Sequence, residues 1–205
     1  MSQLRKWFGP SKDEIWHQLA DQIGARFVEG SWTKGDKVVA THGDWTLTLD
    51  TYVVSTGHTT MVFTRMRAPY VNPDGFRFTI YRRSIFTELG KMLGMQDVEI
   101  GLDPQFDHDF VIKGTDESKL RALFADDAVR TLVAKQPELR LTVKDDEGWF
   151  GPHFPSGVDE LNFAILGVIK DVDRLKDLYE LFAATLDRLC RIGSAYDDKP
   201  GVELI

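Results

Sequence analysis

The 205-residue sequence lacks most of the features that cross-link a fold or anchor a protein in a membrane. A single cysteine, Cys190, excludes an internal disulfide and a cysteine-clustered zinc site. The longest apolar runs span only a few residues, whereas a membrane-spanning helix needs about 20. Arg5 and Lys6 are followed by no apolar stretch, so no secretory signal is expected. We therefore expect a soluble protein in a reducing, cytoplasmic setting.

Positive charge is scarce, with 25 Lys and Arg against 32 Asp and Glu and a net charge of −7. This balance argues against partners such as nucleic acid and anionic membranes. The chain is nevertheless long enough to bury roughly 70% of its unfolded surface, so it needs no structural metal. No cofactor is expected.

Familiar catalytic motifs are also missing. The sequence has no G-x-S-x-G nucleophile elbow, no phosphate-binding G-x-x-x-x-G-K-[ST] loop, no G-x-G-x-x-G and no H-E-x-x-H. Whether the protein is an enzyme stays open, and these absences favour a protein that is not one.

Helical periodicity is clearest near the two ends of the chain. Ser11 and Glu14 form an S-x-x-E capping box before a run of apolar residues spaced three and four apart, which ends at Gly24. A second stripe predicts a long C-terminal amphipathic helix over 172–190, followed by Gly193. Residues from Ala195 onward are expected to form a loosely held end.

Shorter helices are expected in the middle of the chain. Each follows a polar residue that could cap its first turn. They are predicted after Ser84, after Thr115 or Asp116, and after Asp126-Asp127.

Alternation of apolar and polar residues from Phe27 to Tyr81 predicts a meander of about five antiparallel strands. Its most specific turn signal is Asn72-Pro73-Asp74-Gly75, because Pro fixes φ and Gly permits a positive φ. Further strands are predicted over 106–113, 139–143 and 161–165.

The sequence therefore predicts an α+β fold. A mainly antiparallel sheet would combine with an N-terminal helix, central helices and a long C-terminal helix. We expect a single domain over 1–205. The alternative is two lobes, with a helix and antiparallel strands in 1–95 and mixed strands and helices in 96–205.

Basic residues are concentrated between Met61 and Lys91, where six oppose two acids. Strand alternation places Arg65 and Arg67 on one face, while Arg77, Thr79 and Tyr81 line one face of the next strand. A hairpin closed at 72–75 would bring Arg65, Arg67 and Arg77 around one carboxylate or phosphate. The alternative is that these arginines pair with the chain's own acids.

A second candidate site is Asp107 with Asp109. On a strand, the two carboxylates would share a face about 7 Å apart. They could hold Mg²⁺ or Ca²⁺, or divide acid and base roles in a metal- or anion-dependent hydrolase. The alternative is a half-exposed strand whose acids face water.

A third candidate is the aromatic and proline-rich segment over 149–155, which contains Trp149, Phe150 and His153. A stiff, partly apolar loop of this kind suits recognition because little entropy is lost on binding. The alternative is that Trp149 and Phe150 fold back to cap the core.

Several runs of residues resemble an uncharacterised group of bacterial proteins, a domain of unknown function. The runs are 45–52 (WTLTLDTY), 64–70 (TRMRAPY), 75–82 (GFRFTIYR), the F-D-x-x-F-x-I-K-G of 106–114 and 190–196 (CRIGSAY). The resemblance implies a bacterial, cytoplasmic protein and assigns no activity, ligand or residue role.

The leading hypothesis is a non-enzymatic binding or interaction module with an arginine-rich surface. Its partner would be an acidic protein, a small anionic ligand or another copy of the chain. The hydrolase and a structural oligomer subunit are the alternatives. The proposed binding residues are Arg65, Arg67, Arg77, Tyr81, Arg82, Trp149, Phe150 and His153.

Overall fold

A computed structural model describes residues 10–31, 35–85, 98–101, 103–145, 154–202 and 204. The helices are α2 (Lys12–Ile23), α3 (Pro104–Asp109), α4 (Glu117–Phe124), α5 (Asp127–Lys135) and α6 (Val172–Arg191), with a 3₁₀ turn η1 (Arg83–Ile85). The strands are β1 (Arg26–Val28), β2 (Lys37–His42), β3 (Trp45–Ser55), β4 (Thr60–Val71), β5 (Phe78–Arg82), β6 (Phe110–Gly114), β7 (Arg140–Lys144) and β8 (Val158–Leu166).

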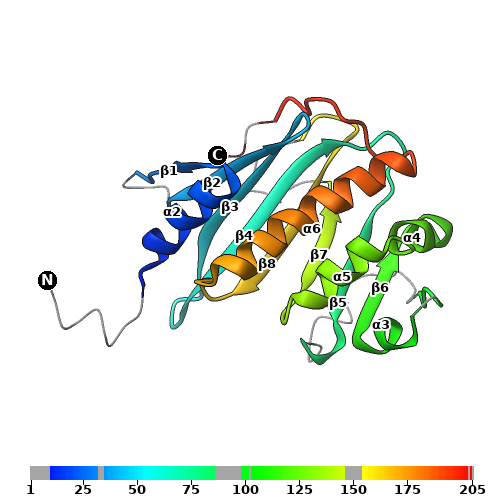
Figure 1. The fold of residues 1–205 in the computed structure, drawn as a ribbon, viewed down its shortest axis with the longest axis horizontal. Helices are drawn as coiled ribbons and strands as arrows, with labels where there is room; N and C mark the ends of the chain where they lie inside the picture. The colour runs from blue at the N-terminus through cyan, green and yellow to red at the C-terminus, as the bar shows by residue number, and fades with distance from the viewer. Residues whose placement is uncertain are drawn as a thin grey trace, which may run out of the picture.

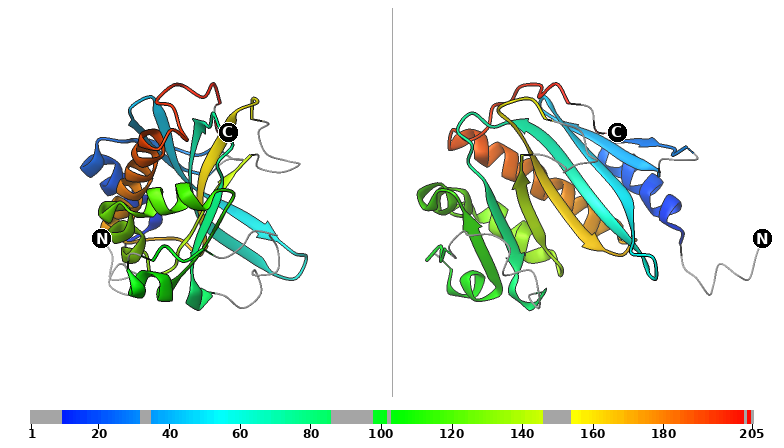
Figure 2. Two further views of the ribbon diagram at one scale, coloured as in Figure 1. Left: turned by 90° about the vertical axis from the view of Figure 1, so that its right-hand side faces the viewer. Right: turned by 180° about the vertical axis from the view of Figure 1, so that it is seen from behind.

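The strands form one eight-stranded sheet in the order β1-β2-β3-β4-β8-β7-β5-β6, and the pairs are antiparallel. The described helices lie together on one face of this sheet (Figure 1). Seen from behind, the strands lie in front of the helices (Figure 2). The predicted α+β fold with a mainly antiparallel sheet is confirmed.

The meander is confirmed for β1 to β4, but the hairpin expected between β4 and β5 is wrong. β4 pairs with β3 and β8, whereas β5 lies between β7 and β6. The turn at 72–75 exists, with Gly75 at φ 67°, but it carries the chain away from β4. The physical reason is that β8 offers β4 a ladder of eight paired residues, more than the five-residue β5 contains.

Local capping signals are confirmed. The Ser11 hydroxyl accepts the Glu14 N–H, and the Glu14 carboxylate accepts the Ser11 N–H, each at 3.2 Å. Gly24 ends α2 in the left-handed conformation. Asp116 and Asp126 are the caps of α4 and α5. Each cap satisfies N–H groups that a first helical turn leaves free, so these boundaries follow from nearby residues.

The strand predicted over 106–113 is wrong in its first half, because α3 occupies 104–109 and β6 begins at Phe110. Asp103 caps α3 by accepting the N–H groups of Gln105 and Phe106, and Pro104 occupies the first turn. The rings of Phe106 and Phe110 lie 4.8 Å apart. A spacing of four residues fits both a strand face and a helix face, which explains the misassignment. The rest of the helix predicted after Ser84, over 86–93, lies outside the described residues.

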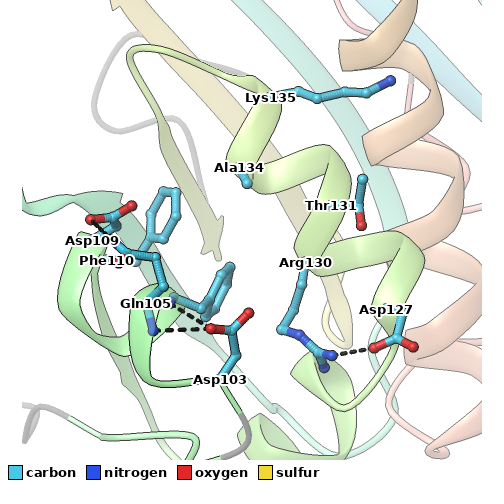
Figure 3. Close-up of a pocket in the computed structure, with 10 residues that line it drawn as sticks. Asp103, Gln105, Asp109, Phe110, Asp127, Arg130, Thr131, Ala134 and Lys135 are labelled. Atoms are coloured by element: carbon cyan, nitrogen blue, oxygen red, sulfur yellow. Dashed lines mark hydrogen bonds and ion pairs between the residues drawn. The ribbon is translucent and has the colours of Figure 1, made fainter.

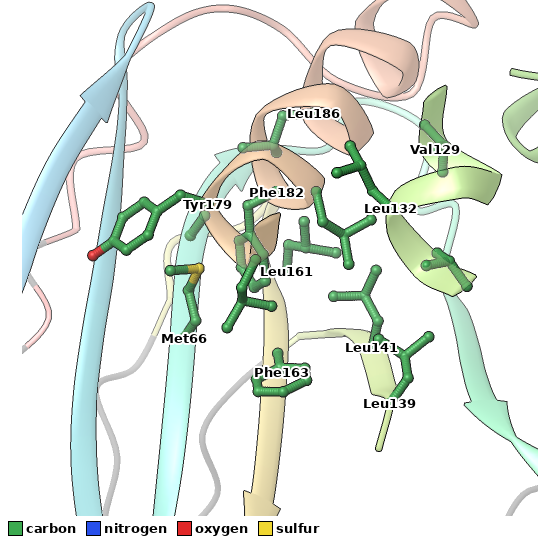
Figure 4. Packing of buried hydrophobic residues seen from close by; sticks show 14 of the residues in the cluster. Met66, Val129, Leu132, Leu139, Leu141, Leu161, Phe163, Tyr179, Phe182 and Leu186 are labelled. Carbon is green, nitrogen blue, oxygen red and sulfur yellow. The ribbon is translucent and has the colours of Figure 1, made fainter. Parts of the chain in front are cut away.

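The core lies between the sheet and α6 with α5 (Figure 4). Leu178, Phe182 and Leu186 of α6 are fully buried, and they belong to the same apolar cluster as Met66 of β4 and Phe163 of β8. The predicted C-terminal stripe is therefore confirmed as the helix that covers the central strands. The Cys190 thiol, near the C-terminal end of α6, is half-buried beside the core, and burial raises the pKa of this thiol.

The C-terminal end is not loosely held, contrary to expectation. Trp45 donates its indole N–H to the Tyr196 carbonyl at 3.2 Å, and the Asp197 carboxylate accepts the Asp44 N–H at 2.8 Å. Farther on, the Lys37 ammonium donates to the Leu204 carbonyl at 3.3 Å. The tail thus runs from the end of α6 back to β2 and β3.

We expect Leu161→Ala to lower the free energy of unfolding by about 2–5 kcal/mol, because it leaves a cavity under α6. Leu161 is fully buried, whereas Leu166 on the same strand is 61% exposed. The matched control Leu166→Ala should change the unfolding free energy by no more than about 0.5 kcal/mol. Urea denaturation measures both, and equal losses would contradict this packing.

Acid should weaken the contacts of Asp74, which joins the turn at 72–75 to α4 and to the segment after α6. Burial alone would raise the pKa of Asp74, but hydrogen bonds from Lys119, the Phe76 N–H and Ser194 outweigh it and lower that pKa. A lowered folded-state pKa stabilises the fold above the unfolded value, about 4, and this contribution is lost as pH falls through the folded value.

Asp74→Asn should therefore be less stable than the wild type at pH 7, and the difference should shrink below about pH 4. Denaturation curves at several pH values measure it. Asp173→Asn, on an exposed side chain of α6, is the control and should differ little at pH 7. A deficit that stays constant down to acid pH would show that Asp74 contributes no charge-dependent stability.

Candidate ligand-binding face

The strand residues that alternate with the core point away from the described helices, and we call this surface the helix-free face. Its charged and polar members come from every strand of the sheet. They are Arg26, Lys37, Thr41, Thr46, Thr48, Asp50, Tyr52, Arg65, Arg67, Thr79, Tyr81, Lys113, Arg140, Thr142, Lys144, Glu160 and Asn162.

A row of buried polar residues crosses this face. Thr48, Arg67, Asn162, Thr142 and Thr79 are successive register partners on β3, β4, β8, β7 and β5, and all five are buried. The hydroxyls of Thr79 and Thr142 lie 2.7 Å apart. Because burying polar groups costs free energy unless they are hydrogen-bonded, such a row is unusual on the second face of a sheet.

Two of the predicted arginines meet at one carboxylate on this face. Arg65 donates to both oxygens of Asp50 at 2.9 Å, and Arg67 donates to one of them at 2.5 Å. The Arg65 guanidinium also lies 5.0 Å from the ring centre of Tyr52. Arg67 is only 1% exposed. The shared face is confirmed, and the structure shows the internal pairing that was the alternative expectation.

Arg77 and Arg82 lie elsewhere. Arg77 donates to Asp159 at 3.0 and 3.1 Å and to Asp145 at 2.8 Å, and Asp159 belongs to the core side of β8. Arg82 donates to carbonyls at the end of α5, and its guanidinium lies 4.6 Å from the Phe110 ring centre. The expected grouping of Arg65, Arg67 and Arg77 is wrong, because it required the β4–β5 hairpin. Tyr81 does lie on the helix-free face, opposite Arg140.

The described strand positions of the helix-free face carry far more positive than negative charge. Only Asp50 and Glu160 are acidic there. The basic residues are Arg26, Lys37, Arg65, Arg67, Lys113, Arg140 and Lys144. The charge at these described strand positions is thus opposite in sign to the net charge of the whole chain, −7. This separation of charge favours anions at the helix-free face.

A groove of about 430 Å³ opens at the β1 end of this face. Its wall is completed by the C-terminal tail, and the described residues that line it include two cations and no acid. They are Arg26, Val28, Lys37, Val39, Thr41, Thr46, Thr48, Pro69, Val202 and Leu204. Thr48 belongs to both the groove and the buried row, and Arg67 is its register partner on β4.

Asp107 and Asp109 do not converge. Asp107 accepts the N–H groups of Ile100 and Gly101, each at 2.8 Å, and so anchors the segment before α3. Asp109 accepts a hydrogen bond from Gln105 at 2.9 Å. The two carboxylates line different hollows, because they lie two residues apart on a helix rather than on one strand face. Within the described ranges, no group of three or more His, Cys, Asp or Glu side chains could hold a metal ion.

Asp109 lines a larger cleft, of about 720 Å³, between α3 and α5 (Figure 3). Its main charged groups are already paired within the chain. Arg130 contacts Asp127, Lys135 donates to Asp177 at 2.7 Å, and Asp103 caps α3. The charged groups that line this cleft are therefore largely engaged within the chain.

The remaining predicted residues, Trp149, Phe150 and His153, lie outside the described residues, and their role stays a prediction.

Sequence analysis missed Arg26 and Lys37. Each is followed in its strand by a residue that faces the core, Phe27 or Val38, and this alternation was the available signal. Nothing in the pattern indicated that the tail would complete a groove beside them.

Comparison with known proteins supports the fold alone. No family model matches the chain, and no curated protein sequence matches it. A solved structure, the mycobacterial trehalose monomycolate transport factor A (TtfA), is similar with a TM-score of 0.52 and 10% sequence identity. The match covers 94% of this chain and 98% of that one. Among the described residues, no helix has the length and apolar character needed to cross a membrane.

We expect Asp50→Asn to destabilise the protein by about 3 kcal/mol, because it removes the carboxylate that two guanidinium groups share, one of them buried. Asp145→Asn is the matched control, since Asp145 is 61% exposed and pairs with Arg77 at the surface. Its cost should be less than about 1 kcal/mol. Guanidinium chloride denaturation compares the two variants, and a smaller loss for Asp50→Asn would refute the importance of this carboxylate.

Proposed function

We propose that this protein is a non-enzymatic binding module that binds an anionic ligand or acidic partner on its helix-free face. The observation that supports this proposal is the seven basic against two acidic residues at the described strand positions of that face, in a chain whose net charge is −7. Such a concentration of positive charge attracts an approaching anion.

The arrangement of the arginines also favours binding. Asp50 holds Arg65 through two hydrogen bonds and Arg67 through one, so both side chains are fixed before any partner arrives. Fixing donors in advance reduces the entropy that binding costs. The planar donors of a guanidinium group suit carboxylate or phosphate.

The residues of the proposed site differ in part from the sequence prediction. Arg65, Arg67 and Tyr81 belong to it, together with Arg26, Lys37 and Arg140. Arg77 and Arg82 are outside it, since both are engaged on the helix side of the sheet.

A bacterial, cytoplasmic setting and a single domain are part of the same proposal. One sheet contains strands from both 1–95 and 96–205, and one apolar cluster joins them, which supports a single domain. TtfA, whose fold is similar, is a transport factor, which is compatible with a binding role for this protein.

Binding on this face is testable by nuclear magnetic resonance with ¹⁵N-labelled protein. Titration with a ten-residue glutamate peptide or with decanoate should shift backbone amide signals of the helix-free strands, with the shifts centred on β2, β3 and β4. Signals of α4, α5 and the exposed side of α6 should move little. The shifts from the peptide should weaken as salt is raised, because exposed charges are screened.

Arg140→Gln on β7 and Arg26→Gln on β1 each remove an exposed cation from the face and should each weaken peptide binding. Lys176→Gln, on the helix side, removes the same charge and should leave peptide binding unchanged. The proposal fails if neither probe shifts the helix-free strands, or if the shifts map to the helices.

A further inference from the structure

We propose that the groove beside β1 and β2 binds a single amphiphile that has one anionic head and an apolar chain. This inference rests on the proposed function and specifies the ligand of one part of the face. It is drawn from the chemistry of the described groove lining, which contains two cations, five apolar side chains and three threonines.

Arg26 and Lys37 would hold the head group. Arg26 is paired in register with Val39, and Lys37 with Val28, so the two cations occupy adjacent strands on the same face. Arg26 is exposed and makes no hydrogen bond or ion pair within the described part of the chain. Lys37 donates one hydrogen bond, to the Leu204 carbonyl, and an ammonium group has three donors. Both cations therefore retain donors for an anion.

The apolar chain of the ligand would lie along the rest of the groove. Val28, Val39 and Pro69 form its floor, and Val202 and Leu204 of the tail form its wall. At about 430 Å³, the groove lies within the range of about 300–1,000 Å³ that is typical of small-molecule sites. Burial of a hydrocarbon chain against these five residues supplies the apolar part of the binding free energy.

The lining favours an amphiphile over the other anions that the face could attract. Inorganic phosphate would contact the two cations and leave five apolar residues unused. An acidic peptide would bring many charges into a groove that has two cations and an apolar wall. Only a ligand with a single charged end matches both halves of the lining.

The test uses displacement of a dansyl-labelled undecanoic acid by decanoate from the full chain. Decanoate should displace the probe, acetate should not, and 1-decanol should compete at least about tenfold more weakly than decanoate, because it lacks the charge. The double variant Arg26→Gln/Lys37→Gln should weaken decanoate binding by about tenfold or more. Lys176→Gln/Arg191→Gln, which removes two cations from α6, is the matched control and should bind decanoate as the wild type does.

A second variant tests the apolar wall. Leu204→Ser should weaken decanoate binding several-fold and leave the amide shifts caused by the glutamate peptide unchanged. Arg26→Glu, a charge reversal at an exposed residue, should weaken decanoate more than Arg26→Gln does.

Three results would overturn the assignment: no displacement by decanoate, equal competition by decanol, or equal decanoate affinity in the wild type and the Arg26→Gln/Lys37→Gln variant. The peptide titration separates this failure from failure of the proposed function. If the peptide still shifts the helix-free strands while decanoate does not bind, the amphiphile is wrong and the anion-binding face stands. If neither binds, both proposals fall.

Discussion

The packing of α6 against the central strands β4 and β8 is the contact on which the rest of the structure depends. Phe182 and Leu186 of α6 are fully buried in the same cluster as Met66 and Phe163 of those strands. Because side chains alternate along a strand, fixing the apolar residues toward α6 sends their neighbours to the other face. The position of the charged face therefore follows from the core, and a one-residue slip of β8 would invert both.

The charged face is not explained by stability. A buried ion pair loses most of its Coulombic gain to desolvation, and apolar residues of similar volume often stabilise a protein as well or better. Asp50, Arg65 and Arg67 are buried or half-buried at the centre of the sheet, where apolar side chains would serve the fold. The buried polar row from Thr48 to Thr79 likewise occupies positions where apolar side chains would serve the fold. What such residues provide is fixed hydrogen-bonding geometry and charge, which a binding surface requires.

The features that could be predicted from the sequence depend on residues close together in the chain. The caps of α2, α4 and α5 and the stripe of α6 are of this kind, since each is set within a few turns of one helix. The neighbour of β5 could not be predicted, because alternation shows which face a residue occupies and not which strand lies beside it. Arg77 was misplaced for that reason. The spacing of Phe106 and Phe110 fits two periodicities, and only the cap at Asp103 decides between them.

The candidate groove could not be predicted from the sequence because segments far apart in the chain build it: β1 to β3, β4 and the tail after α6. The groove cations differ from the arginines at the centre of the face in how firmly they are held. Arg65 and Arg67 are held by Asp50 and contribute a fixed field. Arg26 is exposed and can change rotamer to meet a ligand, at some cost in side-chain entropy. In the proposed binding mode, the charge of the whole face would attract the anion, and the groove's apolar wall would determine which anion stays bound.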